Sequence, residues 1–294
     1  MISIGMPVFN GERFVERAIE SILGQTYTHF ELIISDNGST DRTEEICRRF
    51  AEKDPRIRYI RQSCNIGPAA NFRFVLEAAN YDRFIWAAAD DWWDRDRLEK
   101  LVNALRPEDA VVVGTIKRYL GDSCFAAYTP MAYRRGQWWR FLMREEGRSE
   151  KVYYIYGLMW RDSALRSFAD VRDEYAADGI FCYRMLWSGN LKSIDNATLH
   201  VSTHIQSTSA QKAASYRYSL IRFLFCAHPL SYYANYIRAT PKNVRLWVAL
   251  AIPLKAVVSQ IHLWWRAFRR IVLKRPFVHG ALPGGEKIVR DAGI

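Results

Sequence analysis

The chain has 294 residues, of which 49% are apolar and 25% charged, which is typical of a folded globular protein and excludes a disordered one. The net charge of +11 belongs to one end of the chain. Residues 216–294 carry thirteen lysines and arginines against two acids, whereas residues 1–215 carry 29 of each. A basic tail without a nucleic-acid-binding motif indicates no nucleic-acid partner. The five cysteines form no C-x-x-C pair, so we expect reduced thiols in a cytoplasmic protein.

Strands and helices alternate over the first hundred residues. The chain opens on an apolar run of strand length, so we expect no signal peptide. The predicted strands are Ile2–Val8, Phe30–Ile34, Ile57–Ile60, Phe84–Ala89 and Ala110–Gly114, and the predicted helices are Glu12–Leu23, Thr43–Lys53, Asn71–Ala79 and a segment that ends at Leu105. Such alternation with short connections predicts an α/β fold with a mainly parallel sheet flanked by helices. Neither G-x-G-x-x-G nor a P-loop string is present, which excludes the two commonest nucleotide-binding loops.

Polar side chains follow three of the predicted strands. Asn10 follows the first strand, Asp36 the second, and Asp90 with Asp91 the fourth. The carboxyl ends of parallel strands meet at one edge of a sheet, which is where open α/β sheets bind ligands. Two adjacent carboxylates repel, so the pair indicates a divalent cation, a sugar hydroxyl, or an exposed helix entry with Asp94 as N-cap. Together the strand ends suit a nucleotide diphosphate and its cation.

The order of four short strings resembles glycosyltransferase family 2, whose members have the GT-A fold. The strings are Met6-Pro7-Val8-Phe9-Asn10, Ser35-Asp36-Asn37-Gly38-Ser39-Thr40-Asp41, Asn65-Ile66-Gly67 and Ala89-Asp90-Asp91. The resemblance covers about residues 2–215. It implies an inverting, metal-dependent transferase that uses Mg²⁺ or Mn²⁺ and a sugar linked to UDP, dTDP or GDP. Ser35, Ala88 and Ala177 differ from the family's usual strings.

The resemblance also implies roles for particular residues. Asp91 would hold the metal together with His204, and Asp90 would contact the ribose. The residues expected to bind the nucleotide sugar are Pro7, Phe9, Asn10, Asp36, Asn65, Gly67, Asn71 and Asp90. Asp178 would be the general base that deprotonates the acceptor hydroxyl, with Glu174 and Asp173 as weaker candidates. By itself Asp178 would equally suit the N-cap of the helix that follows it.

We divide the chain into three parts. Residues 1–105 are the predicted nucleotide-sugar-binding half of the GT-A domain, residues 106–215 the acceptor-binding half, and residues 216–294 a basic helical tail. In the second part we expect Val152–Trp160 to form a strand. Its aromatic residues either contact the acceptor's sugar rings or belong to an ordinary core; they are Tyr128, Tyr133, Trp138, Trp139 and Phe141.

The tail has the pattern of amphipathic helices. Leu246–Leu254 is apolar, but with Lys255 after it we expect it to be too short to span a bilayer, and we expect Pro253 to kink or divide the helix. From residue 255 onward a polar stripe opposes an apolar one. The polar stripe is Lys255, Ser259, His262, Arg266, Arg269, Arg270 and Lys274, and the apolar one is Val257, Val258, Ile261, Trp264, Trp265, Phe268, Ile271 and Val272. This pattern is typical of a helix lying in a membrane interface, with packing on the catalytic domain or a partner as the alternative.

These features predict an inverting sugar transferase, peripheral to the inner face of the cell membrane, in the synthesis of surface polysaccharide or a lipid-linked glycan. Two alternatives stay open. A catalytically silent GT-A domain could tether an assembly to the membrane, which the departures at Ser35, Ala88 and Ala177 would permit. A sugar nucleotidyltransferase would need a glycine-rich loop after the first strand, and residues 7–11 do not form one.

Overall fold

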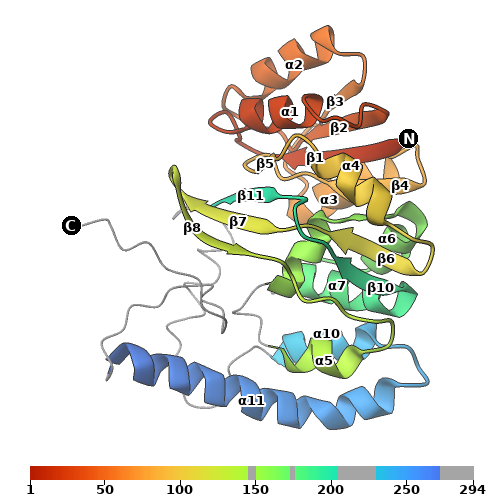
Figure 1. Cartoon of the computed structure of the whole chain (residues 1–294), viewed down its shortest axis with the longest axis vertical. Helices are drawn as coiled ribbons and strands as arrows, with labels where there is room; N and C mark the ends of the chain where they lie inside the picture. Colours follow the sequence, from red (N-terminus) through yellow and green to blue (C-terminus); the bar gives the residue numbers. More distant parts are fainter. Residues whose placement is uncertain (145–149, 173–175, 204–229, 272–294) are drawn as a thin grey trace.

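The computed structural model describes residues 1–144, 150–172, 176–203 and 230–271. Its centre is a seven-stranded sheet with the strand order β10-β6-β9-β4-β1-β2-β3 (Figure 1). The strands are β1 (Ile2–Val8), β2 (Phe30–Asp36), β3 (Ile57–Arg61), β4 (Arg83–Trp86), β6 (Asp109–Val113), β9 (Leu158–Trp160) and β10 (Asn190–Ser193). Neighbouring strands are parallel except where β9 lies antiparallel between β4 and β6. The predicted mainly parallel sheet is therefore confirmed, and it takes strands from both sides of residue 105.

Helices cover both faces of this sheet. They are α1 (Val15–Leu23), α2 (Thr43–Lys53), α3 (Pro68–Glu77), α4 (Arg97–Ala104), α6 (Arg161–Phe168) and α7 (Ala177–Ser188). Right-handed crossovers from β1 through β2 to β3 place α1 and α2 on one face, and the return to β4 places α3 on the other. On that second face α3 packs against α6, and α6 packs against α7.

The centre of the core explains why the strands are continuous apolar runs. Every residue of β1 is buried, as a strand covered on both faces requires. At the end of β4, Trp86 is fully buried, and its ring lies 5.4 Å from that of Phe168 and 5.3 Å from that of Phe181 between centroids. The Trp86 Nε1 donates a hydrogen bond to the backbone oxygen of Phe72 at 3.1 Å. The end of β4 is thereby fixed in the sheet.

A second, four-stranded sheet has the order β5-β11-β7-β8. Its strands are β5 (Trp92–Trp93), β11 (Leu199–Ser202), β7 (Ile116–Leu120) and β8 (Ser123–Tyr128). β11 pairs with β5, which directly follows Asp91, and this pairing sets the end of β11 beside the acids that follow β4. The two sheets meet at Gly114, which lies between β6 and β7 and packs directly on Ala197.

The strand expected over Val152–Trp160 is wrong for most of its length. Residues Glu150–Tyr156 form a 3₁₀-helix, and only Leu158–Trp160 form a strand. The Tyr154 backbone oxygen accepts from the Gly157 N–H at 3.1 Å, a local bond that a strand does not make, and the Tyr154 side chain is buried. Its hydroxyl donates to the backbone oxygen of Met131 at 2.8 Å. Among the aromatic residues of this part, Tyr128, Tyr133 and Phe141 are buried in the core, whereas Trp139 is exposed.

Three helices complete the described chain: α5 (Trp138–Met143), α10 (Leu230–Ala239) and α11 (Arg245–Ile271). α11 packs against α5 and α10 at one end of the molecule (Figure 1). The expected division at Pro253 is wrong, because α11 continues through this proline. The expected shortness is also wrong: the span Arg245–Trp265 is long and apolar enough to cross a membrane by length and composition, and an 18-residue window in it has a mean hydropathy of 1.6. A single lysine does not interrupt such a stretch.

The contact at Gly114 predicts a steric effect on stability. A Cβ atom at this position would lie 1.7 Å from the backbone oxygen of Ala197, so Gly114→Ala must push the two sheets apart. We expect a loss of about 2 kcal/mol or more in the free energy of unfolding, measured with urea. Gly24→Ala is the matched control, since its Cβ would lie 3.3 Å from the nearest atom. Equal stability of the Gly114 variant and this control would contradict the packing.

Candidate active site

The site lies where the strand order of the large sheet reverses. From β1 the chain proceeds to β2 and β3 on one side, whereas β4 pairs with β1 on the other. Val8 pairs with Asp36, and the Ala87 backbone N–H donates to the Gly5 oxygen, so the three strands end at the same edge. Ligands of open α/β sheets bind in the crevice at such a switch point.

The loops after β1 and β2 are joined by hydrogen bonds. Asn10 has a left-handed backbone, with a φ of 51°, which asparagine tolerates better than most residues. Its backbone N–H donates to the Ser39 Oγ at 2.9 Å, and its Oδ1 accepts from the Thr40 N–H at 2.9 Å. The Gly11 N–H donates to the Thr43 Oγ1 at 2.8 Å. The two loops therefore form one rigid wall.

Asp36 is the centre of this wall. Its carboxylate is fully buried and accepts hydrogen bonds from the Ser39 N–H at 2.8 Å, the Tyr59 hydroxyl at 2.8 Å and the Arg61 Nη1 at 3.1 Å. Three donors offset the desolvation of this charge. In the described structure Asp36 therefore shapes the loop after β2.

A third loop precedes α3 and is tied to the second. The Asn37 Nδ2 donates to the Asn65 Oδ1 at 3.0 Å, and the same Asn65 oxygen accepts from the Gly67 N–H at 2.9 Å. Asn71 is buried, and its amide exchanges two hydrogen bonds with Ser35. Of the residues predicted to bind the nucleotide sugar, Phe9, Asn10 and Asn65 are exposed, Gly67 and Asp90 are partly exposed, and Pro7, Asp36 and Asn71 are buried.

The two adjacent acids differ in their surroundings. Asp91 is buried and accepts a hydrogen bond from the Ser202 backbone N–H at 2.9 Å, whereas Asp90 is partly exposed. Burial raises the pKa of Asp91 well above its ordinary value, and the charge of Asp90 raises it further. A hard divalent cation suits this pair, because it takes carboxylate oxygens and completes its shell with phosphate and water. His204 lies outside the described residues, among which no group of three or more metal-binding side chains is found.

A buried arginine lies beneath the acids. Arg97, on α4, donates to the backbone oxygen of Ala197 and, at 2.9 Å, to that of Tyr156. Burial lowers the pKa of Arg97 to about 9, and the charges of Asp91 and Asp94 oppose this shift, so it stays a cation at neutral pH. Asp94 is not an N-cap, because its carboxylate instead contacts the His200 Nε2 at 2.8 Å.

Asp178 lies in the first turn of α7 and is partly exposed. The N-cap alternative is wrong: Ala176 occupies that position, in a left-handed conformation with a φ of 60°. The Asp178 Oδ1 accepts a hydrogen bond from the Gly179 N–H at 2.8 Å. The weaker candidates for the base, Asp173 and Glu174, lie outside the described residues.

Two tyrosines connect Asp178 with the acid pair. Burial raises the pKa of Tyr156 well above its ordinary value, and the charges of Asp91 and Asp90 raise it further. The charge of Asp178 likewise raises the pKa of Tyr156. Burial also raises the pKa of Tyr153, which again lies within the field of both Asp91 and Asp178. The charges of Asp178 and Asp91 therefore act on the same two tyrosines.

Comparison with known proteins decides the family. Residues 3–170, more than half of the chain, match the family model described as glycosyl transferase family 2. The chain belongs to glycosyltransferase family 2. The resemblance of the four strings is thereby confirmed.

Curated relatives match this chain over different lengths. An uncharacterized glycosyltransferase of Haemophilus influenzae is 41% identical over 35% of this chain and 41% of its own length. The putative teichuronic acid biosynthesis glycosyltransferase TuaG of Bacillus subtilis is 33% identical over 34% of this chain and 40% of its own. The uncharacterized glycosyltransferase EpsJ, also of Bacillus subtilis, is 25% identical over 98% and 91%. The chain spans less than half the length of the first three relatives.

Solved structures share the fold at low identity. TarS residues 1–349 of S. aureus, in complex with UDP-GlcNAc, aligns with a TM-score of 0.55 at 14% identity over 92% of this chain and 91% of that one. The mannosyltransferase PcManGT of Pyrobaculum calidifontis, in complex with GDP-Man and Mn²⁺, aligns with a TM-score of 0.57 at 16% identity over 96% and 76%. These likenesses confirm the predicted GT-A fold class.

The surroundings of Asp91 predict an unusual effect on stability. Its pKa is raised in the folded protein, so its ionisation weakens folding as the pH rises from its ordinary value of 3.8 through the raised one. Asp91→Asn should therefore raise the free energy of unfolding at pH 7 by about 1 kcal/mol or more, since one pKa unit corresponds to about 1.4 kcal/mol. Urea unfolding in EDTA between pH 4 and pH 8 measures this effect.

Asp94→Asn is the matched control with the opposite sign. Hydrogen bonds to its carboxylate lower the pKa of Asp94 against the effect of burial, so this charge stabilises the fold above its unfolded pKa. The variant should be less stable than the wild type at pH 7. A loss of stability in the Asp91 variant at this pH would contradict the description of the pair.

Proposed function

We propose that the chain transfers a sugar from a nucleotide diphosphosugar to an acceptor hydroxyl, with inversion at the anomeric carbon. The observation that carries the proposal is the acid pair at the carboxyl edge of the sheet, where Asp91 is buried beside Asp90; Asp178 supports it, because its charge acts on Tyr153 and Tyr156 together with theirs. An inverting displacement needs a base on one side of the sugar and the leaving diphosphate on the other, and two separated acidic groups around one crevice suit it.

Each group then has a defined task. The loops that hold Phe9 and Asn65 bind the nucleoside of a UDP-, dTDP- or GDP-linked donor, and Asp90 accepts from its ribose. Asp91 holds the divalent cation. When bound, Mg²⁺ or Mn²⁺ offsets the negative charge of the departing diphosphate. Asp178 accepts the proton of the attacking hydroxyl.

The relatives support a place in surface-glycan synthesis. TuaG is described as a putative teichuronic acid biosynthesis glycosyltransferase, and it is 33% identical to this chain over 100 residues. We therefore propose that the product is a surface polysaccharide or a lipid-linked glycan, made at the inner face of the cell membrane.

The base is tested by Asp178→Asn. The amide keeps the shape of the side chain but cannot accept the proton, so transfer should fall about 10²- to 10⁴-fold. Binding of the nucleotide sugar, measured by calorimetry, should stay near the wild-type affinity. Asp162→Asn, which changes an exposed acid on α6, is the control and should keep full activity. Near-normal turnover in the Asp178 variant would remove this residue from the mechanism.

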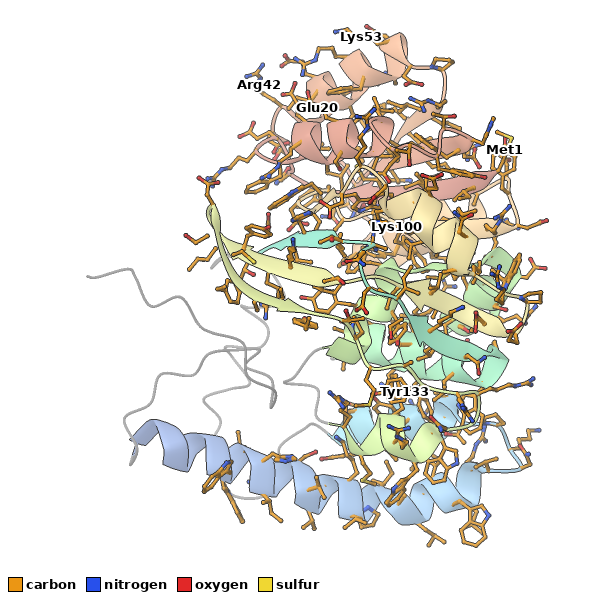
Figure 2. All side chains as sticks on the ribbon, in the orientation of Figure 1. Met1, Glu20, Arg42, Lys53, Lys100 and Tyr133 are labelled. Carbon is orange, nitrogen blue, oxygen red and sulfur yellow. The ribbon has the colours of Figure 1, made fainter. Side chains whose placement is uncertain are left out.

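The membrane association rests on the exposed face of α11. Along one side of this helix, side chains project away from the rest of the protein (Figure 2). The exposed apolar residues are Leu246, Trp247, Leu250, Leu254, Val257, Ile261, Trp264 and Trp265. Their spacing makes one stripe along the helix, about 28 Å long at a rise of about 1.5 Å per residue. A contiguous apolar surface of this size marks an interaction site.

The inward face of α11 carries both apolar and polar residues. Lys255 and Ser259 are buried, and the Lys255 Nζ donates to the backbone oxygen of Arg144 at 3.1 Å. Lys255 and Ser259 of the polar stripe thus face the protein, whereas the exposed apolar residues face away from it. Tryptophans lie at both ends of the stripe, and the sequence continues with Arg266 and Arg269. We therefore propose that α11 lies in the membrane interface, parallel to the bilayer, instead of crossing it.

Flotation with vesicles of phosphatidylglycerol and phosphatidylethanolamine tests this orientation. Leu250→Asn with Leu254→Asn should lower the floating fraction at least several-fold, because both side chains are exposed in the centre of the stripe. The fold should be unaffected, as circular dichroism can show. Leu120→Asn, at an exposed leucine of β7, is the control. If the double variant floats as well as the wild type, the stripe does not bind the membrane.

A further inference from the structure

A cavity of about 280 Å³ lies beside the amino-terminal end of α7, between this helix and α10. Its charged lining is Arg172, Arg184, Arg238 and Asp170. Among the described residues that line the cavity, three arginines stand against one carboxylate. The volume is at the lower end for ligand pockets, ~300 to 1,000 Å³, so the cavity suits a headgroup and not a whole glycan.

Arg184 is the most enclosed of the three. Its side chain is 17% exposed, whereas that of Asp170 is 84% exposed and lies 3.8 Å away. One Nη atom of Arg184 donates to the Ser167 backbone oxygen at 3.2 Å. A weak pair with an exposed carboxylate offsets little of the desolvation of this guanidinium. Burial accordingly lowers the pKa of Arg184, and Asp170 only opposes the shift. An additional anion would stabilise this charge.

The end of α7 adds to the positive field. Ala177, the first residue of this twelve-residue helix, lines the cavity, whereas the Gly179 N–H of the same turn already donates to the Asp178 Oδ1. The amino-terminal end of a helix carries a partial positive charge and unpaired N–H groups that bind phosphate. Arginine is the side chain that best matches phosphate oxygens.

We propose that this cavity binds a phosphate group, and that it holds the phosphate that joins the acceptor to its lipid. The source of the phosphate rests on the proposed function, whereas phosphate binding itself does not. The position of the cavity supports this source. One residue along α7 from Ala177 is Asp178, the proposed base, and α10, which contributes Arg238, packs against α11. A lipid-linked acceptor could therefore reach the base, the cavity and the apolar stripe together.

The first experiment measures binding without any transfer. Farnesyl diphosphate is titrated into the full chain by calorimetry, in EDTA so that no divalent cation can bind a diphosphate at Asp91. We expect Arg184→Gln with Arg238→Gln to bind at least tenfold more weakly than the wild type. Arg166→Gln, an exposed arginine of α6 outside the cavity, should bind normally. Because Arg238 is exposed, the single variant Arg238→Gln should fold normally and lose part of the affinity for farnesyl diphosphate.

Two further arms identify the source of the phosphate. Farnesol, which lacks the phosphates, should bind equally weakly to the wild type and the double variant. If the double variant also loses binding to phosphatidylglycerol vesicles, but not to phosphatidylcholine vesicles, the cavity binds bilayer headgroups as well. An unchanged affinity for farnesyl diphosphate in the double variant, or an equal loss of farnesol binding, would overturn the proposal. Failure of sugar transfer with every donor would instead remove the proposed function and leave this result standing.

Discussion

The structure depends on two neighbouring carboxylates held at the end of a buried strand. β4 ends at Trp86, whose ring is enclosed by Phe168 and Phe181, so the segment that follows cannot withdraw into solvent. Asp91 is consequently desolvated beside Asp90, and the Ser202 backbone N–H donates a hydrogen bond to its carboxylate. Such a pair destabilises the protein by itself and becomes favourable when a cation and a diphosphate are bound. This desolvation would favour the binding of a cation and a nucleotide sugar that we propose.

The surrounding elements can be understood as the support of this pair. Arg97 joins α4 to the 3₁₀-helix that carries Tyr153 and Tyr156, and it adds a permanent positive charge below the acids. The contact of Gly114 with Ala197 holds the second sheet against the first, which keeps β11 in reach of Asp91. The wall of the site is also rigid, because the side chains of Asp36 and Asn10 accept hydrogen bonds from the backbone of the loop after β2. A preorganised site of this kind needs little rearrangement when a ligand enters.

Much of this arrangement could be predicted from the sequence, because it depends on patterns of neighbouring residues. Continuous apolar runs give buried strands, and polar residues directly after them must lie at the carboxyl edge, so Asn10, Asp36 and the acid pair were placed correctly on one edge. The features that the sequence does not predict depend on contacts between residues far apart in the chain. The roles of Arg97 and Tyr156 follow from packing between segments some 60 residues apart, which no local spacing reveals. The outward turn of the apolar stripe of α11 depends likewise on where Lys255 finds its partner, the backbone of Arg144.

The central claim is that the strand-end acids form a site for an activated sugar. Calorimetry with a panel of UDP-, dTDP- and GDP-linked sugars, with and without Mn²⁺, tests it most directly. The account predicts that one nucleotide class binds, and that its affinity falls at least tenfold without the cation and in Asp91→Asn. The absence of binding to every member of the panel in the presence of Mn²⁺ would contradict the account and favour a domain that only tethers an assembly.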